Sequence, residues 1–185
     1  MNVVELIKKY QIGIKDFSGV NLAGAILSNT DLSQINLSQA MLAEVDFTGT
    51  NLERAVLSQA ILDLSNLSEV NLDRANLKSA SLKSTLLYKA SCARAQLSKA
   101  DLSQAILKRA FLREANLNQA KLKAADLSQA NLIDADLTGA DLSQANLEKA
   151  FLQGANLYQA TVTEANLKQA VLIGATMPDG QLFNH

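Results

Sequence analysis

Residues 95–150 read AQLSK ADLSQ AILKR AFLRE ANLNQ AKLKA ADLSQ ANLID ADLTG ADLSQ ANLEK A when they are written in groups of five. In this stretch alanine holds the first place of every group and leucine holds the third. An apolar residue keeps the third place from Phe17 to Leu172, and the exceptions to leucine are Phe17, Phe47, Cys92 and Val162. Because the register never slips, we expect one continuous repeat structure without inserted loops.

A period of five fits neither a straight helix nor a straight strand. In a helix, residues five apart are separated by about 140° around the axis, so the leucines would face every direction. In a strand, side chains alternate with a period of two, so successive leucines would lie on opposite faces. The leucines share one axis only if the chain turns a corner in every repeat, and such repeats bury their apolar face by stacking. The sequence therefore predicts a solenoid.

The repeat A-(D/N)-L-x-x, seen in ADLSQ, ANLNQ, ADLTG and ANLEK, resembles that of the pentapeptide-repeat family. The resemblance extends over nearly the whole chain, from about Asp16 to Ala175. It implies an all-β solenoid: a right-handed, four-sided (quadrilateral) β-helix of just under eight coils, with one pentapeptide on each side and the leucines inside. The other solenoid considered, a hexapeptide left-handed β-helix, requires a six-residue register that this sequence lacks.

The two ends of the chain depart from the repeat. We expect residues 1–15 to form a capping helix and plug, residues 16–175 the β-helix, and residues 176–185 a C-terminal cap or tail. The helix is predicted from residue 2 to about residue 10, because Asn2 with Glu5 resembles a capping box and the apolar residues recur at helical spacing. These apolar residues are Val3, Leu6, Ile7 and Tyr10. Their stripe is expected to cover the open end of the first coil.

At the C-terminal end, the repeat pattern breaks after Ala175. Pro178 lacks a backbone donor and Asp179-Gly180 favours a tight turn, so we expect the coil to stop here. Leu182 and Phe183 are then left either to fold over the last coil of the same chain or to contact a second copy. The second alternative predicts a homodimer formed through a coil end, and the sequence does not choose between the two.

The composition is typical of one domain without a membrane segment. The chain has 185 residues, of which 48% are hydrophobic but only 4% aromatic, as a narrow column of leucine and alanine requires. No apolar run approaches 18 residues, so no membrane contact is expected. At the N-terminus the Lys8–Lys9 pair follows the apolar residues, which is the reverse of a signal peptide and favours a cytoplasmic protein. Cys92 stands in the leucine column and is interpreted as a buried, reduced filler.

No set of side chains suited to catalysis is visible. The one histidine is His185, and the one cysteine has no partner, so neither a nucleophile–base pair nor a zinc-binding set can be assembled. Asp and Asn recur just before the leucines, and residues 20 apart, such as Asp126, Asn146 and Asn166, should stack. Stacked carboxylates would suit a metal ion, but a column that recurs along the whole rod favours Asx side chains that bind their own backbone. We therefore predict a non-enzymatic protein without catalytic residues, metal or cofactor.

Charge is the feature most informative about function. The net charge is −1, but residues 74–123 contain eleven Lys/Arg against two acidic residues, whereas the segments on either side are each net −5. A basic belt is therefore expected at mid-height, densest where Tyr88 and Lys89 lie one coil from Lys108 and Arg109. Such a cluster would attract an acidic protein, an anionic ligand or a phosphate backbone. The alternative is a solvated band of charge that keeps the rod soluble.

Phe111 and Phe151 add a candidate apolar contact, because they are two coils apart on one side in a column where side chains are expected to be partly exposed. With the basic cluster they define the candidate partner surface. The best hypothesis is a non-catalytic scaffold with an unknown protein partner. The family resemblance implies an alternative, a gyrase-binding DNA mimic, and the belt implies another, binding of a polyanion. A DNA mimic needs a strongly negative surface along the rod, whereas the middle of this rod is expected to be positive. The net charge of −1 argues against binding of nucleic acid.

Overall fold

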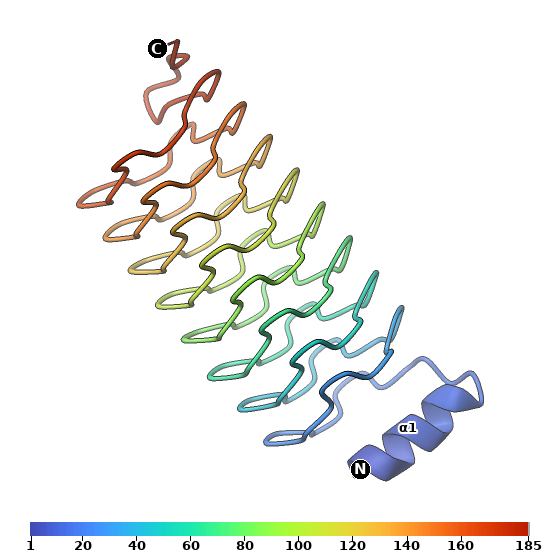
Figure 1. Ribbon diagram of the computed structural model, residues 1–185. Helices are drawn as coiled ribbons and strands as arrows, with labels where there is room; N and C mark the ends of the chain where they lie inside the picture. Colours follow the sequence, from blue (N-terminus) through green and yellow to red (C-terminus); the bar gives the residue numbers. More distant parts are fainter. Residues whose placement is uncertain (185) are drawn as a thin grey trace.

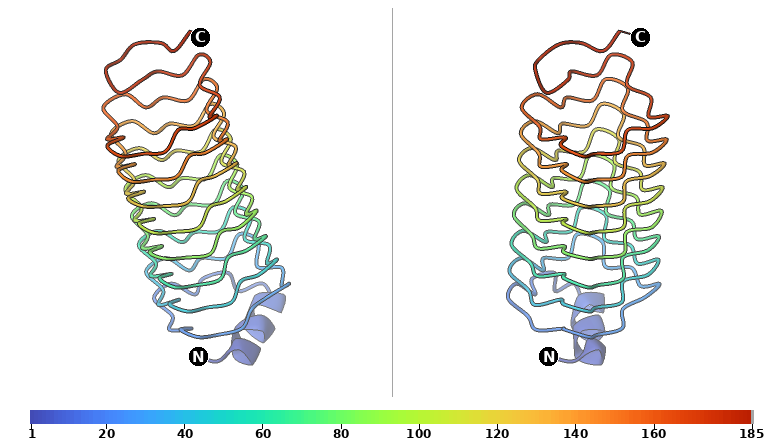
Figure 2. Two further views of the ribbon diagram at one scale, coloured as in Figure 1. Left: turned by 60° about the vertical axis from the view of Figure 1, so that its left-hand side comes forward. Right: turned by 90° about the vertical axis from the view of Figure 1, so that its left-hand side faces the viewer.

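In the computed structural model, which describes residues 1–184, the chain forms a rod of stacked coils with one α-helix at its N-terminal end (Figure 1). The helix α1 comprises Val3–Gln11 and lies against the first coil, while the C-terminus is at the other end of the rod (Figure 2). Each pentapeptide from Asp16 onward contributes a single bridge residue followed by a tight turn. The rod is therefore built from corners rather than from long strands.

The bridges define four sides. Each bridge residue pairs in parallel with the residue twenty positions later. Four pentapeptides thus make one coil, and we number the sides by their first bridge residues: Asp16 (side 1), Asn21 (side 2), Ile26 (side 3) and Asp31 (side 4). Because the chain passes the sides in this order, side 1 lies opposite side 3 and side 2 lies opposite side 4. The predicted four-sided coil is confirmed.

Backbone hydrogen bonds join neighbouring coils in every repeat. On side 4, the Leu52 amide donates to the Asn71 carbonyl (2.7 Å) and the Arg54 amide donates to the Asp73 carbonyl (2.9 Å). The Ala55 amide closes the corner by donating to the Leu52 carbonyl (3.0 Å). Arg54, at the fifth place of the repeat, has a φ of +58°, and most other residues at this place are equally left-handed without being glycine. That conformation costs a non-glycine residue about 1–2 kcal/mol, and the hydrogen bond to the next coil holds it in place.

The interior of the rod is the leucine column, flanked by the small residues of the first place. Three hydroxyl residues replace alanine in the small column and are fully buried. Each hydroxyl donates to a backbone carbonyl: Thr50 to Leu27 (2.7 Å), Ser65 to Leu42 (2.8 Å) and Thr85 to Leu82 (2.8 Å). These polar atoms therefore bring no unpaired donor into the core. The prediction that the leucines point inward is confirmed.

The predicted N-terminal helix is also confirmed. α1 begins after Asn2, whose side-chain Oδ1 accepts a hydrogen bond from the Glu5 amide at 2.9 Å. Leu6 is buried in the core, and the Tyr10 hydroxyl donates to the Ser33 carbonyl on side 4 at 2.8 Å. One apolar face of α1 thus covers the end of the first coil, where leucines would otherwise meet water.

At the C-terminal end, the coil is one repeat longer than the small-residue column indicates. Thr176 still bridges Asn156, and the Pro178 carbonyl accepts a hydrogen bond from the Gln159 amide at 3.0 Å. Proline fits because the amide at its place in the repeat takes no part in the backbone ladder between coils; the amide of Ser18, at the same place, donates to the Asp16 side chain. The missing donor of Pro178 therefore does not stop the ladder.

Sides 2 and 3 end differently from the other two sides. In the described residues no further coil lies over residues 161–165 and 166–170, the last repeats of these sides. Val162 and Leu167 belong to the inward column but are only half-buried. The C-terminal end of the rod therefore exposes part of its core, unlike the end that α1 covers.

Candidate interaction surface

The outward Asp/Asn column performs a structural task. On side 4 the Asn51 Oδ1 accepts a hydrogen bond from the Glu53 amide at 3.1 Å, so the side chain binds its own turn. Its Nδ2 donates to the Asp31 Oδ1 (2.9 Å), and the Asn71 Nδ2 donates in turn to the Asn51 Oδ1 (3.1 Å). The predicted Asx–backbone bonds are confirmed. The side-chain hydrogen bonds between Asp and Asn residues of adjacent coils were not predicted, because they cannot be seen within a single repeat.

The same hydrogen bonds stabilise the ionised carboxylates. The Ser143 hydroxyl and the Ser143 amide both donate to the Asp141 carboxylate, the amide to Oδ1 at 3.0 Å, and these bonds lower the pKa of Asp141. Within residues 1–184, no group of three or more His, Cys, Asp and Glu side chains is placed to hold a metal ion. His185 lies outside the described residues. Cys92 is buried in the leucine column, and this burial raises the pKa of its thiol to about 12.

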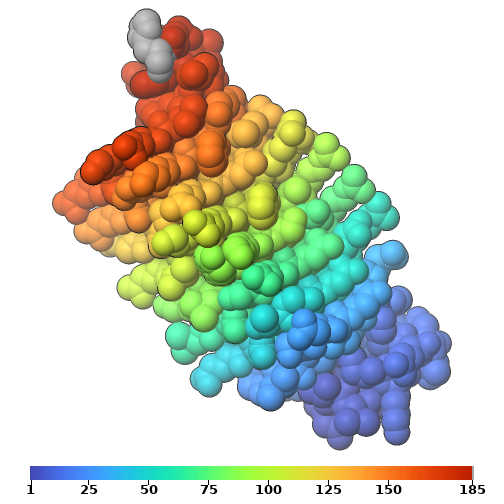
Figure 3. Space-filling view, in the orientation of Figure 1, coloured from blue at the N-terminus to red at the C-terminus, as the bar shows by residue number. Residues whose placement is uncertain are grey.

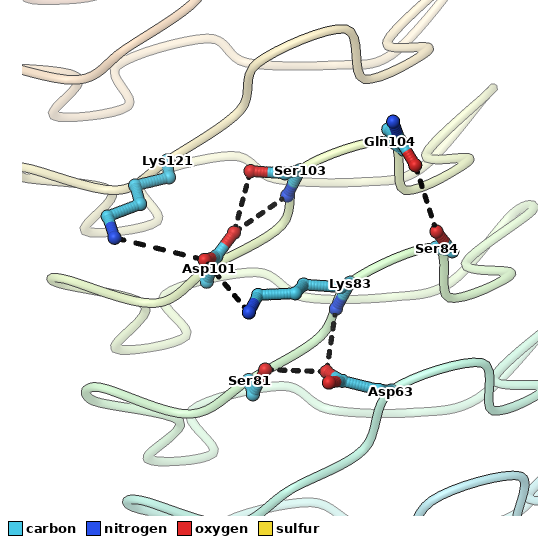
Figure 4. A network of polar contacts seen from close by, with 8 residues as sticks. All are labelled: Asp63, Ser81, Lys83, Ser84, Asp101, Ser103, Gln104 and Lys121. Carbon is cyan, nitrogen blue, oxygen red and sulfur yellow. Dashed lines mark hydrogen bonds and ion pairs between the residues drawn. The ribbon is translucent and has the colours of Figure 1, made fainter.

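The basic belt is uneven around the rod, and on side 2 it is partly neutralised (Figure 4). Asp101 Oδ2 lies 3.8 Å from Lys83 Nζ and 3.9 Å from Lys121 Nζ, and Asp101 Oδ1 accepts a hydrogen bond from the Ser103 hydroxyl at 2.7 Å. Asp63, two coils below Asp101, accepts from the Ser81 hydroxyl at 2.5 Å and from the Lys83 amide at 3.0 Å, both on the coil between them. Sequence reasoning missed this network, although separations of 18 and 20 residues already place its members on adjacent coils.

Side 4 carries a second group of paired charges. Arg94 Nε lies 2.8 Å from Glu114 Oε2, and this hydrogen bond lowers the pKa of Glu114. Arg113 Nε lies 3.3 Å from Glu114 Oε1, and its Nη2 lies 3.8 Å from Asp134 Oδ2. These side chains are well exposed, so the pairs contribute little to stability. Their effect is to cancel much of the positive charge on this side of the belt.

Side 3 holds the basic cluster that the sequence predicted as partner surface. Lys89 Nζ lies 5.2 Å from the centre of the Tyr88 ring and 3.8 Å from Glu69 Oε1. Arg109 Nη1 donates to the Tyr88 hydroxyl at 3.5 Å, while its Nε donates to Gln129 Oε1 at 2.8 Å. The structure therefore brings Tyr88, Lys89, Lys108 and Arg109 together on adjacent coils.

Two cations of this cluster have no acidic partner. Among residues 1–184, Lys108 and Arg109 form no ion pair, in contrast to Lys83, Lys121, Arg94 and Arg113. Arg109 is held by neutral groups only, so its charge is oriented but not cancelled. The uncompensated positive charge of the belt therefore includes an ordered arginine on side 3.

The corner between sides 3 and 4 joins this cluster to the two phenylalanines. A surface groove of about 470 Å³ lies there, between Arg109, Gln129 and Lys149 on side 3 and Phe111, Asn131 and Phe151 on side 4. Phe111 is 51% exposed and Phe151 is 43% exposed. Arg109 belongs both to the basic cluster and to the groove, so the two sets of predicted residues form one continuous surface. The sequence analysis did not select Lys149, although its position two residues before Phe151 could have pointed to it.

Leu182 and Phe183, the two residues predicted to make an end contact, differ in their environment. Phe183 packs partly against the core, and its backbone carbonyl accepts a hydrogen bond from the Gly174 amide at 2.8 Å. Leu182 forms an antiparallel bridge with Thr176, while its side chain is 60% exposed. Phe183 thus folds back over side 4 of the same chain, and Leu182 faces outward.

Comparison with known proteins agrees with this repeat architecture. A family model described as pentapeptide repeats matches the chain in eight copies, over residues 16–54, 50–87, 90–132, 115–154 and 150–184. The chain belongs to the pentapeptide-repeat family. No curated protein matches the chain significantly. α1, with nine residues, is the one helix that the structure describes, and no helix among these residues is long and apolar enough to cross a membrane.

Three solved structures of this family are similar to the chain. HetL, a pentapeptide-repeat protein involved in heterocyst differentiation regulation in the cyanobacterium Nostoc sp. strain PCC 7120, is 35% identical over 99% of this chain and 100% of its own, with a TM-score of 0.33. The protein alr5209 of Nostoc PCC 7120 is 26% identical over 92% of this chain and 94% of its own, with a TM-score of 0.24. QnrB1, a plasmid-mediated fluoroquinolone resistance protein, is 19% identical over 85% of each chain, and its TM-score of 0.78 shows the same fold.

Proposed function

We propose that this pentapeptide-repeat protein is a non-catalytic scaffold that binds an acidic protein partner through one surface at mid-height. This surface, here called the basic–aromatic surface, consists of Tyr88, Lys89, Lys108, Arg109, Phe111 and Phe151. The observation that carries the proposal is its continuity around the corner, where uncancelled cations adjoin exposed aromatic rings. Exposed rings beside Arg and Tyr are the composition that protein interfaces favour.

The neighbouring sides support the choice of this surface. On side 2, Asp101 forms ion pairs with the neighbouring lysines, and on side 4, Glu114 forms ion pairs with the neighbouring arginines. On side 3, Lys108 and Arg109 retain their charge for an external carboxylate. HetL, which is 35% identical, acts in a regulatory process, and this fits a binding role better than a catalytic one.

The charge distribution argues against the two alternative functions. A gyrase-binding DNA mimic needs a negative surface along the rod, whereas residues 74–123 hold eleven Lys/Arg against two acidic residues. The likeness to QnrB1 concerns the fold alone. Binding of a polyanion needs many free cations in a row, and ion pairs occupy Lys83, Arg94 and Lys121 of the belt. A salt dependence much steeper than a protein interface shows would nevertheless favour a polyanion.

The test is affinity capture from a lysate of the source organism at low and at moderate salt. The full chain is compared with Lys89→Glu/Lys108→Glu and with a control, Lys78→Glu/Lys99→Glu, which reverses two unpaired lysines on the opposite side 1. A partner protein retained by the wild type and the control but lost with the side 3 variant supports the proposal. Equal capture by all three proteins would show that the cluster is only a solvated band of charge.

We further propose that the coil is right-handed, as the family resemblance implies, and that the protein is cytoplasmic.

We also propose a homodimer that forms through the C-terminal end of the rod. This is supported by the uncovered residues 161–170 and by the exposed Leu182 side chain. Light scattering on the full chain and on a Leu182→Glu variant tests the dimer, because a charge at this contact would reduce the particle mass to that of a monomer.

A further inference from the structure

The groove at the corner of sides 3 and 4 has a repeating geometry. Phe111 bridges Asn131, which in turn bridges Phe151, so the two rings lie two coils apart with an asparagine between them. At about 4.8 Å per coil, the backbones that carry the rings are separated by roughly 10 Å. Figure 3 shows the coils as parallel ridges of side chains.

This spacing leaves room for one planar side chain between the two rings. Aromatic pairs place their ring centres about 4.5–7 Å apart, so a ring above Asn131 lies within reach of both phenylalanines. The groove volume of about 470 Å³ is ample for an indole or phenol ring with its adjoining backbone. The two phenylalanines therefore form the two ends of a slot rather than a flat patch.

The other wall of the groove is cationic. Arg109, Gln129 and Lys149 lie on three successive coils, at the corner next to the three side 4 residues. Gln129 Oε1 and the Tyr88 hydroxyl accept hydrogen bonds from Arg109 Nε and Nη1, and within residues 1–184 Arg109 Nη2 makes no hydrogen bond. Lys149 Nζ lies 3.5 Å from Oε1 of the half-buried Glu148, and because the Lys149 side chain is exposed, a stronger acceptor can replace this pair. Among residues 1–184, no acidic residue lines the groove.

The phenylalanines cannot make the hydrogen bonds that polar residues make at their place. At this outward place on side 4, Asn51 and Asn71 accept the amide hydrogen bond of their own turn and link to the coil below. Phe111 and Phe151 can do neither, and half of each ring is exposed. Apolar residues such as Met41 and Ile61 hold the same place on side 2, so what distinguishes Phe111 and Phe151 is that they are aromatic and line a groove with cations.

We infer that this groove binds an extended acidic segment of the partner protein and takes up one aromatic side chain of that segment between Phe111 and Phe151. The inference rests on the proposed function and specifies its partner: carboxylates beside the aromatic residue bind Arg109 and Lys149, while the ring enters the slot. The charge complementarity selects an acidic segment, and the apolar walls select an aromatic anchor.

The test uses fluorescence anisotropy with labelled peptides and the full chain. The probe is a short peptide with a central tryptophan flanked on both sides by aspartates; the controls replace the tryptophan by alanine, or the aspartates by lysines. We expect the probe to bind at least about tenfold more tightly than either control. Equal binding of the tryptophan and alanine peptides, or no binding of the probe, would overturn the inference.

Matched variants locate the binding. Phe111→Ala/Phe151→Ala should weaken the probe about tenfold or more, whereas Met41→Ala/Ile61→Ala should not change it. The control residues occupy the same outward place on the opposite side 2, and each is 45% exposed. If the phenylalanine variant binds the probe as tightly as wild type, the groove is not the site. Loss of the lysate partner with the Lys89→Glu/Lys108→Glu variant would still support the proposed function in that case, so the two ideas fail separately.

Discussion

Leu62 and Leu64 are two residues apart in one repeat, and the coil gives them opposite environments. Leu62 is fully buried in the central column, whereas Leu64 lies at a corner with a φ of +62° and is 63% exposed. The place in the repeat, and not the residue type, therefore decides what a side chain does. The inward places carry the architecture, so function must be sought in the outward places.

A second comparison separates structure from function among the outward places. Asn71 and Phe111 occupy the same place on side 4, two coils apart. Asn71 binds its own turn, through the Asp73 amide at 3.0 Å, and the side chain of Asn51 one coil below. Phe111 lines the groove instead. Polar ladders thus reinforce the coil where they occur, and the aromatic interruption marks the candidate site.

The largest effect is expected from placing a charge in the column. Leu62→Asp would bury a carboxylate without a partner, which costs about 3–5 kcal/mol or more, so this variant should lose its cooperative thermal unfolding or melt far below wild type. Leu64→Asp should change the melting temperature by a few degrees at most, because its side chain is in water. Circular dichroism melts of both variants measure this, and equal losses would contradict the inward assignment of Leu62.

The interior was predictable because one rule fixes it. A five-residue register requires a corner in every repeat, so the inward leucine column follows from Leu and Ala, and the capping role of α1 follows from the helix pattern of residues 3–10. The number of sides came from the resemblance to the pentapeptide-repeat family. The C-terminal boundary was less predictable, because the fit of Pro178 depends on which amides are used between coils. That information belongs to the stacked structure and is absent from the local sequence.

A smaller effect is expected from the buried thiol of Cys92. Burial raises its pKa to about 12, from 9.0 for a free thiol. Below pH 9 the thiol is protonated in both states, whereas above pH 9 it ionises only in the unfolded chain. This lowers the free energy of unfolding by about 1.4 kcal/mol per pH unit up to the folded pKa. Urea unfolding of wild type and Cys92→Ala at pH 8 and pH 10 should therefore show the wild type losing more stability, and a constant difference would contradict this.

The smallest effect is expected at the outward ladder. Asn71→Ala removes the acceptor of the Asp73 amide and a hydrogen bond to Asn51, and should cost about 1 kcal/mol in urea unfolding. Phe111→Ala, at the same place, should cost less than half of that, because the ring makes no hydrogen bond and is half exposed. A larger loss at Phe111 than at Asn71 would show that the ring supports the fold.

The candidate site was predictable only in part. Folding the sequence onto a 20-residue coil brought Tyr88, Lys89, Lys108 and Arg109 together, and it placed Phe111 and Phe151 on one side. It did not show which cations are cancelled, because ion pairs depend on side-chain reach across coils, as Asp101 demonstrates with Lys83 and Lys121. It assigned the cluster and the phenylalanines to one candidate surface, but it did not show the groove at the corner that joins them or that Gln129 and Lys149 line it.

The most direct test of the central claim is the double variant Phe111→Asn/Phe151→Asn, measured for both stability and peptide binding. Asparagine restores the residue that the coil uses at this place, so the account predicts a melting temperature equal to or above that of wild type. It predicts at the same time that the acidic tryptophan peptide binds at least about tenfold more weakly. A variant that melts well below wild type, or that binds the peptide as tightly as wild type, would contradict the division between an architectural interior and a functional aromatic corner.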